Sequence, residues 1–369
     1  MLRLAIAIVG IVLASLGAIP AAAQERVVNI YNWSDYIDPK VLEEFAKETG
    51  IKVVYDTFDS NDVLETKMLA GKSGYDVIVP SHTYLKRMIQ AGVLQRLNKT
   101  KIPNLKFAWP EITGRMSGYD PGNEYAVNYM WGTTGIGYNV AKVKQRIGNT
   151  LLDTWDLVFK PENFAKFRSC GIHMLDAADE MIPAALKYLA LDPDSKKAAE
   201  IERAGELLMK IRGSVRKFHS SEYINALASG EICLVIGWSG DIYQARSRAK
   251  EAAEKTGKPP VEIDYALPKE GALMWFDSFA IPKDAEHVEA AHSFIDFMMR
   301  PEIAARNTNF VAYASGNLEA QKSVDKEILA NRSIYPDAAT FARLYTVTPY
   351  PQDVQRIVTR IWTRVKSGR

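Results

Sequence analysis

Apolar residues after residue 24 follow two alternating periods, one typical of strands and one typical of helices. Residues 27–31 are apolar and β-branched, which predicts a strand. Asp38 and Pro39 supply an N-cap and a first-turn proline, and a helical apolar face then runs to Gly50. The alternation continues with a strand, a helix and a strand over residues 51–55, 63–69 and 75–79. This order predicts parallel strands with helical crossovers, which is an α/β fold.

A second α/β region follows in the later part of the chain. Its predicted helices cover residues 183–191, 198–211, 224–228, 285–299 and 353–365. Its predicted strands cover residues 232–236, 261–266 and 276–281. The sequence contains no tandem repeat, low-complexity tract or long linker, so we expect two lobes joined by crossing strands rather than two independent domains.

The N-terminus has the pattern of a secretory signal peptide. Arg3 gives a short basic region, residues 4–19 are mostly apolar, and small residues at 21–23 precede Gln24. We expect cleavage after Ala23 and export. The alternative is an uncleaved membrane anchor, but the apolar stretch is short for a span and ends in a cleavage pattern.

Composition and charge favour a globular protein. Of the 369 residues, 47% are hydrophobic and 24% are charged, which is typical of a folded chain. The formal net charge is +2, and loss of Arg3 with the signal peptide leaves +1. This balance argues against nucleic acid as a partner. The two cysteines, Cys170 and Cys233, allow either one disulfide or two separate buried thiols.

Three motifs suggest an enzyme at first sight but do not fit one. The glycines at 132, 135 and 137 lack the G-x-G-x-x-G spacing, and we interpret them as tight turns near a cleft. Gly237-Trp-Ser-Gly240 is one residue short of a nucleophile elbow, which makes Ser239 a poor nucleophile. His287 and His292 are five apart, and the histidines do not cluster. We therefore expect a binding protein rather than an enzyme.

Aromatic residues stand beside acids at the ends of several predicted strands. The four segments are residues 31–36, 237–241, 275–277 and 311–314. Ligands of open α/β sheets bind at strand ends. Asp35, Asp241 and Asp277 can neutralise an ammonium, and aromatic faces attract cations and cover methylene groups. For any single residue the alternative is core packing or a helix cap, but four such segments favour a site for a flexible organic cation.

Several longer segments resemble a known family. They are residues 30–37 (IYNWSDYI), 48–55 (ETGIKVVY), 75–81 (YDVIVPS), 131–139 (WGTTGIGYN), 218–221 (FHSS), 236–241 (IGWSGD) and 362–368 (WTRVKSG). Together they resemble the spermidine/putrescine-binding proteins of polyamine ABC importers, in the putrescine-type branch. The resemblance extends over essentially the whole mature chain.

The resemblance implies an architecture and a role. The fold is that of a type II periplasmic binding protein, with two α/β lobes, a hinge and a ligand cleft between them. The first lobe would contain residues 24–136 and about 262–310, and the second about 137–261 and 311–369. The implied function is periplasmic capture of putrescine or spermidine by a monomer that needs no cofactor. The implied partner is an inner-membrane ABC permease.

The resemblance also assigns roles to individual residues. The aromatic box would consist of Trp33, Tyr36, Trp238 and Tyr313. One ammonium end would be held from the first lobe by Ser34, Asp35 and Ser81. From the second lobe the ligand would meet Glu180, and further carboxylates would come from Asp241 and Asp277. Cys170 and Cys233 occupy positions that resemble the disulfide pair of the family.

One position departs from the putrescine-type pattern. Trp275 stands where that pattern has phenylalanine, and a larger ring changes the shape of the slot and adds cation–π surface. Our hypothesis is that Trp275 favours or permits spermidine. The alternative is an aromatic exchange that leaves putrescine preferred.

Two further alternatives remain open at the level of sequence. The same fold carries other cargo, such as ferric ion held by neighbouring tyrosines or sugars held by aromatics with fewer acids. An exported enzyme or a signalling sensor on the same scaffold is the second alternative. The polyamine site is favoured because the acids are suited to charge pairing and no nucleophile–base pair is visible in the sequence.

Overall fold

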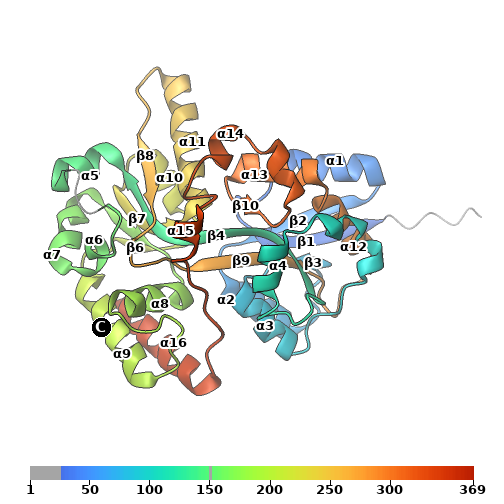
Figure 1. The fold of residues 1–369 in the computed structure, drawn as a ribbon, viewed down its shortest axis with the longest axis horizontal. Helices are drawn as coiled ribbons and strands as arrows, with labels where there is room; N and C mark the ends of the chain where they lie inside the picture. The colour runs from blue at the N-terminus through green and yellow to red at the C-terminus, as the bar shows by residue number, and fades with distance from the viewer. Residues whose placement is uncertain (1–25, 149–151) are drawn as a thin grey trace, which may run out of the picture.

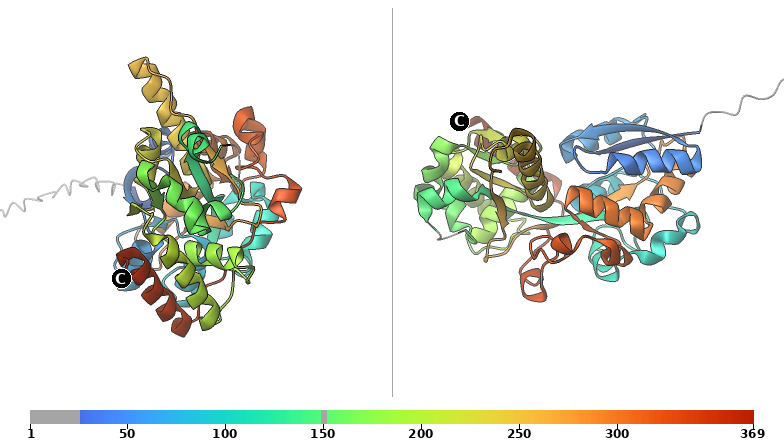
Figure 2. Two further views of the ribbon diagram at one scale, coloured as in Figure 1. Left: turned by 90° about the vertical axis from the view of Figure 1, so that its left-hand side faces the viewer. Right: turned by 90° about the horizontal axis from the view of Figure 1, so that it is seen from above.

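The computed structural model describes residues 26–148 and 152–369, which form two lobes joined by strands (Figure 1). Its strands follow the order β2-β1-β3-β9-β4-β7-β5-β6, with β8 and β10 each paired to β4. Figure 2 shows the two lobes side by side, with connecting segments running between them. The predicted signal peptide, residues 1–23, lies outside the described residues.

The first lobe has the predicted order of alternating strands and helices. Its parallel strands are β1 (Val27–Trp33), β2 (Lys52–Phe58) and β3 (Val77–Ile78), and its helices are α1 (Pro39–Thr49), α2 (Asn61–Ala70) and α3 (His82–Gln90). The Asp38 carboxylate accepts a hydrogen bond from the backbone N–H of Lys40, and Gly50 ends α1 at φ 66°. The predicted caps of α1 are therefore confirmed.

The second lobe is built around three parallel strands. These are β5 (Ile172–Met174), β6 (Lys217–Phe218) and β7 (Leu234–Trp238). Its main helices are α8 (Ala178–Tyr188), α9 (Ala198–Arg212), α10 (Tyr223–Ala228), α11 (Ser239–Thr256) and the C-terminal α16 (Gln352–Ser367). The prediction that α8 begins at Pro183 is wrong, because this proline lies inside the helix. The earlier start places Glu180 in the first helical turn.

A long strand, β4, connects the lobes. β4 (Ala126–Asn139) pairs through its first part with β9 (Met274–Ala280) and β10 (Ala314–Ser315), and through its last part with β7 and β8 (Ile263–Ala266). The pairing places β8 with the second lobe and β10 with the first. The division predicted from the sequence has boundaries near residues 262 and 311. It therefore assigns β8 to the first lobe and β10 to the second, which is the opposite of what the strand pairing shows.

The glycines at 132, 135 and 137 belong to β4 and do not form the tight turns predicted from the sequence. Large side chains cross the strand at each of these positions. A Cβ atom at Gly132 would lie 2.6 Å from the indole of Trp275, and one at Gly137 would lie 2.3 Å from Ile242. The glycines are therefore needed for close packing over the connecting strand.

Shorter elements complete the two lobes and the connections between them. The remaining helices are α4 (Pro110–Met116), α5 (Val140–Ile147), α6 (Asp156–Phe159), α7 (Pro161–Phe164), α12 (Val288–Met298), α13 (Pro301–Val311), α14 (Lys326–Leu329) and α15 (Ala338–Phe341). The 3-10 turns are η1 (Lys99–Lys101), η2 (Pro103–Phe107), η3 (Ala165–Cys170) and η4 (Glu319–Ser323). Within the described ranges, none of the helices combines the length and apolar character needed to cross a membrane.

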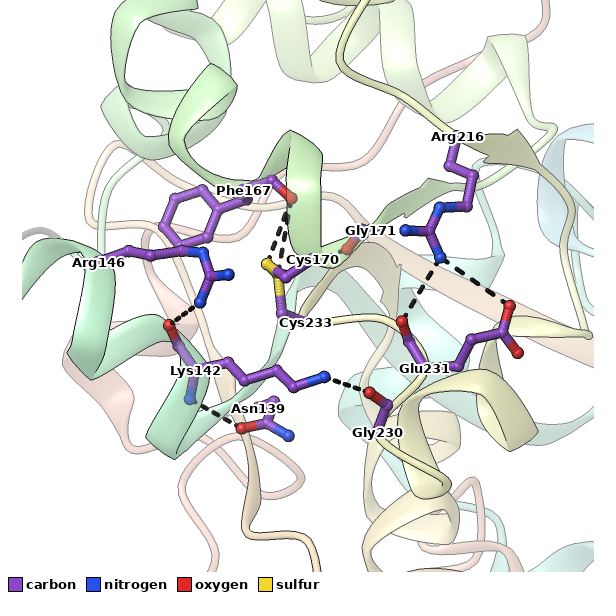
Figure 3. The surroundings of a disulfide bond; sticks show 10 residues. All are labelled: Asn139, Lys142, Arg146, Phe167, Cys170, Gly171, Arg216, Gly230, Glu231 and Cys233. Carbon is purple, nitrogen blue, oxygen red and sulfur yellow. Dashed lines mark hydrogen bonds and ion pairs between the residues drawn. A yellow bond between two sulfur atoms is a disulfide. The ribbon is translucent and has the colours of Figure 1, made fainter.

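A disulfide joins Cys170 and Cys233 in the second lobe (Figure 3). Cys170 is the last residue of η3, and Cys233 directly precedes β7. Their Cα atoms are 5.6 Å apart across a sequence separation of 63 residues. The sequence left two free thiols as an alternative, and the structure confirms the pairing that the family resemblance implied.

We expect the double substitution Cys170→Ser/Cys233→Ser to lower the free energy of unfolding by about 2–4 kcal/mol, because the cross-link restricts the unfolded chain. Urea unfolding followed by circular dichroism measures this change. Reduced wild-type protein is the matched control and should unfold at the same urea concentration as the variant. An unchanged midpoint in the variant would contradict a stabilising role.

Candidate functional site

A cavity between the two lobes brings together most of the predicted site residues. The predicted residues that line it are Trp33, Ser34, Tyr36, Ser81, Glu180, Trp238, Asp241, Trp275, Asp277 and Tyr313. They come from the ends of β1 and β7, from the segments after β1 and β3, from β9, from the first turns of α8 and α11, and from the segment after α13. Most of these residues lie at strand or helix ends, as the sequence predicted, but Asp277 lies in the middle of β9 rather than at its end.

Aromatic rings from both lobes form the walls of this cavity. Trp33, the last residue of β1, contacts Trp238 at the end of β7. Their ring centroids are 5.4 Å apart and their planes are at 79°. The ring centroid of Tyr313 lies 5.1 Å from that of Tyr36 and 5.3 Å from that of Trp275. Edge-to-face contacts of this kind fix ring orientation. The rings leave apolar faces for a carbon chain and π faces for a cation.

Asp277 is held in place by two hydroxyl groups of the first lobe. The Tyr36 hydroxyl donates to Oδ2 at 2.8 Å, and the Ser81 hydroxyl donates to Oδ1 at 2.6 Å. Asn61 in turn donates from Nδ2 to the Ser81 oxygen at 3.0 Å. The carboxylate is therefore oriented by the protein before any ligand arrives.

Asp241 is oriented in the same way in the second lobe. Tyr313 and Tyr223 donate their hydroxyls to Oδ1 and Oδ2, each at 2.6 Å. Asp241 lies in the first turn of α11, two residues after the first residue of the helix. Gly240 makes room for the Tyr313 ring, because a Cβ there would lie 2.4 Å from a ring carbon.

Glu180 lies between the aromatic wall and the connecting strand β4. The Trp238 indole donates from Nε1 to both of its oxygens, at 2.9 and 3.1 Å. Thr134 of β4 also donates its hydroxyl to this carboxylate. A single glutamate thus ties the second-lobe tryptophan to the strand that joins the lobes.

Asp35 lies outside the lining of the cavity. Its side chain is 42% exposed and forms an ion pair with Arg248 of α11, with 2.6 Å between Oδ1 and the guanidinium nitrogen. Its backbone has φ 56°, a left-handed conformation that turns the chain after β1. The structure therefore places Asp35 in a contact between the lobes, whereas the other predicted residues surround the cavity.

The cavity also contains residues that sequence reasoning did not assign. They are Asp59, Asn61, His82, Thr83, Asp179, Ser220, Ser221, Leu273 and Val347. Ser220 and Ser221 belong to the segment that carried the family resemblance, and Asp179 directly precedes the predicted Glu180. Burial lowers the pKa of His82 to about 3, so this ring is neutral at neutral pH. Only tertiary structure brings these segments to one surface.

The charged side chains in the described lining of the cavity are acidic. Five carboxylates line it, from Asp59, Asp179, Glu180, Asp241 and Asp277, and no lysine or arginine is among the described residues of the lining. Burial raises the pKa of Asp277 to about 7 and that of Asp241 to about 6. Burial and the nearby Asp62 raise the pKa of Asp179, and burial and Asp179 raise the pKa of Glu180. An organic cation relieves this unfavourable burial of negative charge.

Comparison with known proteins identifies relatives of the whole chain. The family model for bacterial extracellular solute-binding proteins matches residues 40–332. The chain is 51% identical over 356 residues to the putrescine-binding periplasmic protein SpuD of Pseudomonas aeruginosa, covering 96% of each chain. It is 48% identical over 350 residues to the putrescine-binding periplasmic protein PotF of Escherichia coli, covering 94% of this chain and 93% of that one.

A solved structure shares the fold. The spermidine/putrescine ABC transporter substrate-binding protein PotD from Streptococcus pneumoniae superposes with a TM-score of 0.73 at 28% identity. The alignment covers 93% of this chain and 99% of that protein. The predicted two-lobed architecture of periplasmic binding proteins is therefore confirmed.

The raised pKa values predict how the ligand-free protein responds to pH. An aspartate in the unfolded chain has a pKa of about 4, whereas Asp241 and Asp277 have pKa values of about 6 and about 7 in the folded protein. Protonation of these acids therefore contributes stability that is complete below about pH 4 and is lost as the pH rises through their folded pKa values. We expect the melting temperature of the ligand-free protein to fall between pH 5 and pH 8, as differential scanning calorimetry measures. The variant Asp277→Asn should show a smaller fall, and an equal fall in both proteins would contradict this origin.

Proposed function

Since this chain belongs to the bacterial extracellular solute-binding proteins, and within them to the periplasmic polyamine-binding proteins, we infer that it captures putrescine, spermidine or both and delivers them to an ABC importer. The observation that carries this function is the cavity between the lobes, where five acids and several aromatic rings meet without a lysine or arginine in the described lining. Ammonium groups neutralise the acids, and the rings cover the methylene groups between them.

In this proposal, two carboxylates would receive ammonium groups of the ligand. Asp277 and Asp241 each accept two hydroxyl donors, which leaves the remaining lone pairs of their oxygens for ammonium hydrogens. Ser34 and Ser81, at the ends of β1 and β3, add hydroxyl oxygens on the first-lobe side. Glu180 would meet the ligand from the second lobe beside Trp238.

Lobe closure is the proposed mechanism of capture. The ligand touches both lobes and so stabilises the closed form, and the importer recognises the closed surface. The relatives are periplasmic proteins, so the protein is exported to the periplasm. We further propose that the signal peptide is cleaved near Ala23 and that the mature protein works as a monomer.

The geometry disfavours other cargo for this fold. A ferric site built from tyrosines requires phenolates, but Tyr36 and Tyr313 donate their hydroxyls to Asp277 and Asp241. Burial and these neighbouring acids raise the pKa of both phenols well above the usual value, which opposes ionisation. A neutral sugar would leave the buried carboxylates unneutralised.

Capture for transport is also favoured over catalysis. The relatives are substrate-binding proteins of transporters and not enzymes. A sensor role on the same scaffold is separable by experiment, because deletion of the gene would abolish a transcriptional response and leave uptake intact. The importer role predicts that deletion abolishes uptake of the polyamine.

The direct test of the function is identification of the ligand. Native purification followed by mass spectrometry should release a polyamine, and calorimetry on the stripped protein should show tight binding of putrescine or spermidine. A protein that binds none of the polyamines offered would overturn the proposed function.

We expect Asp241→Ala to weaken polyamine binding by about 2–5 kcal/mol, because a buried ammonium loses its counter-charge. Trp238→Ala should also weaken binding strongly, through loss of the ring and of its hydrogen bonds to Glu180. Glu251→Ala, an exposed acid on the same helix as Asp241, is the matched control. Near-native affinity in both site variants, measured by calorimetry, would place the site elsewhere.

Trp275 provides a test of selectivity. Its indole packs on Tyr313 and over Gly132, so exchange for the smaller phenylalanine ring changes the space beside the ligand. We expect Trp275→Phe to shift the ratio of spermidine to putrescine affinity toward putrescine. Calorimetric titration of both amines measures the ratio, and an unchanged ratio would mean that the exchange does not set preference.

A further inference from the structure

Tyr223 is a buried tyrosine that lies behind the wall of the site. It belongs to α10, is 0% exposed and is not among the described residues that line the cavity. Its hydroxyl nevertheless contacts two residues that do line the cavity. It donates to Oδ2 of Asp241 at 2.6 Å, and it accepts a hydrogen bond from the backbone N–H of Trp238 at 3.2 Å. A single phenol oxygen thus connects an acid and an aromatic residue that the second lobe presents to the ligand.

The backbone amide determines the direction of the hydrogen bond to Asp241. An amide N–H can only donate, so the Tyr223 oxygen accepts from Trp238 and its one proton is directed to the carboxylate. Tyr313 repeats this arrangement, because its oxygen accepts from the backbone N–H of Asp241 at 3.2 Å and donates to Oδ1 at 2.6 Å. Both oxygens of Asp241 therefore receive a phenol proton. Hydrogen bonds of this kind favour the charged form of the acid.

The contact between Tyr223 and Asp241 is internal to the second lobe. The elements α10, β7 and α11 follow one another along the chain and carry Tyr223, Trp238 and Asp241. Strand β7 makes room for the phenol ring at Gly237, where a Cβ atom would lie 3.1 Å from two ring carbons. Tyr313 instead comes from the segment between α13 and β10, and β10 pairs with the first-lobe part of β4. Tyr223 is therefore the partner of Asp241 that does not depend on the first lobe.

The surroundings of Asp241 show why a hydrogen-bond donor is needed there. Burial raises the pKa of Asp241 to about 6, and the hydrogen bonds from Tyr223 and Tyr313 oppose this rise. The other titratable or charged groups that face Asp241 are Asp35 and Tyr36 after β1, Arg248 of α11 and Asp277 of β9. The Arg248 guanidinium is already bound to Asp35. Loss of the Tyr223 hydroxyl would therefore raise the pKa of Asp241 further.

We propose that Tyr223 is a positioning residue for ligand binding, which acts through Asp241 and Trp238 without touching the ligand. This inference rests on the proposed polyamine function and adds to it a residue outside the cavity. The hydroxyl keeps the carboxylate charged and fixed in direction, so that the lone pairs that remain on its oxygens are available to an ammonium group. The same oxygen holds the backbone of Trp238, whose indole donates to Glu180.

The test is calorimetry on the wild type and on Tyr223→Phe between pH 5 and pH 8, with whichever of putrescine and spermidine the wild type binds more tightly. The exchange removes the hydroxyl and keeps the ring that fills the space beside Gly237. We expect the variant to bind about tenfold more weakly at pH 7, because Asp241 loses a donor and the N–H of Trp238 loses this acceptor. The affinity of both proteins should fall as the pH is lowered, since protonated Asp241 no longer neutralises an ammonium. This fall should begin at a higher pH in the variant.

Two comparisons separate this role from a general loss of structure. In the Asp241→Asn background, removal of the Tyr223 hydroxyl should leave the pH profile as it is in Asp241→Asn alone, because the group that titrates is absent. Tyr265→Phe is the matched control. This tyrosine of β8 is 4% exposed and donates to the backbone oxygen of Thr133 rather than to an acid, so its exchange should keep the wild-type pH profile.

Carbon-13 NMR of the wild type with labelled aspartate is a second measurement, which needs no change at Tyr223. The Asp241 carboxyl, identified by the loss of its signal in Asp241→Asn, should be ionised at pH 7 in the ligand-free protein. The proposal is overturned if that carboxyl is protonated at pH 7, if Tyr223→Phe binds as tightly as the wild type, or if it weakens binding by the same factor at every pH. In each of these outcomes the wild type still binds a polyamine, so the proposed function stands. Failure of the wild type to bind either amine would instead overturn that function.

Discussion

Burial of several carboxylates against one another is the constraint on which this structure depends. Asp241, Asp277, Glu180 and Asp179 lie between two lobes, and the described lining of their cavity offers no lysine or arginine to neutralise them. Burial raises the pKa of all four acids, so their ionisation without a cationic partner costs the folded protein free energy. Because acids of both lobes line the cavity, a cationic ligand that neutralises them contacts both lobes.

The connecting strands place the acids on both sides of the cavity. β4 pairs with the first-lobe strand β9 along one part and with the second-lobe strands β7 and β8 along another. Asp277 lies on β9 itself, and Asp241 lies in the first turn of the helix that follows β7. Glycines along β4 allow large side chains to cross it closely, including the Trp275 indole at Gly132. The same strand therefore joins the lobes and lies against side chains that line the site, such as the Trp275 indole.

Tyrosine and serine hydroxyls orient the acids before the ligand binds. Tyr36 and Ser81 hold Asp277, and Tyr223 and Tyr313 hold Asp241. Neutral donors fix the position of a carboxylate without cancelling its charge, so attraction for a cation remains. A lysine or arginine in the same place would satisfy the acids and remove the reason to bind a ligand.

The sequence by itself determined the local structure and the chemistry of the site. Periodicity and caps predicted β1, α1 and β2, and aromatic residues beside acids predicted a cation site with Trp33, Trp238 and Asp277. These features depend on neighbours in the chain. Only the tertiary structure decided that Asp35 pairs with Arg248, that Asp179 joins the acids of the cavity, and that the glycines of β4 lie under side chains from other elements. Such outcomes depend on strand pairing and side-chain direction across long sequence separations, which no local pattern encodes.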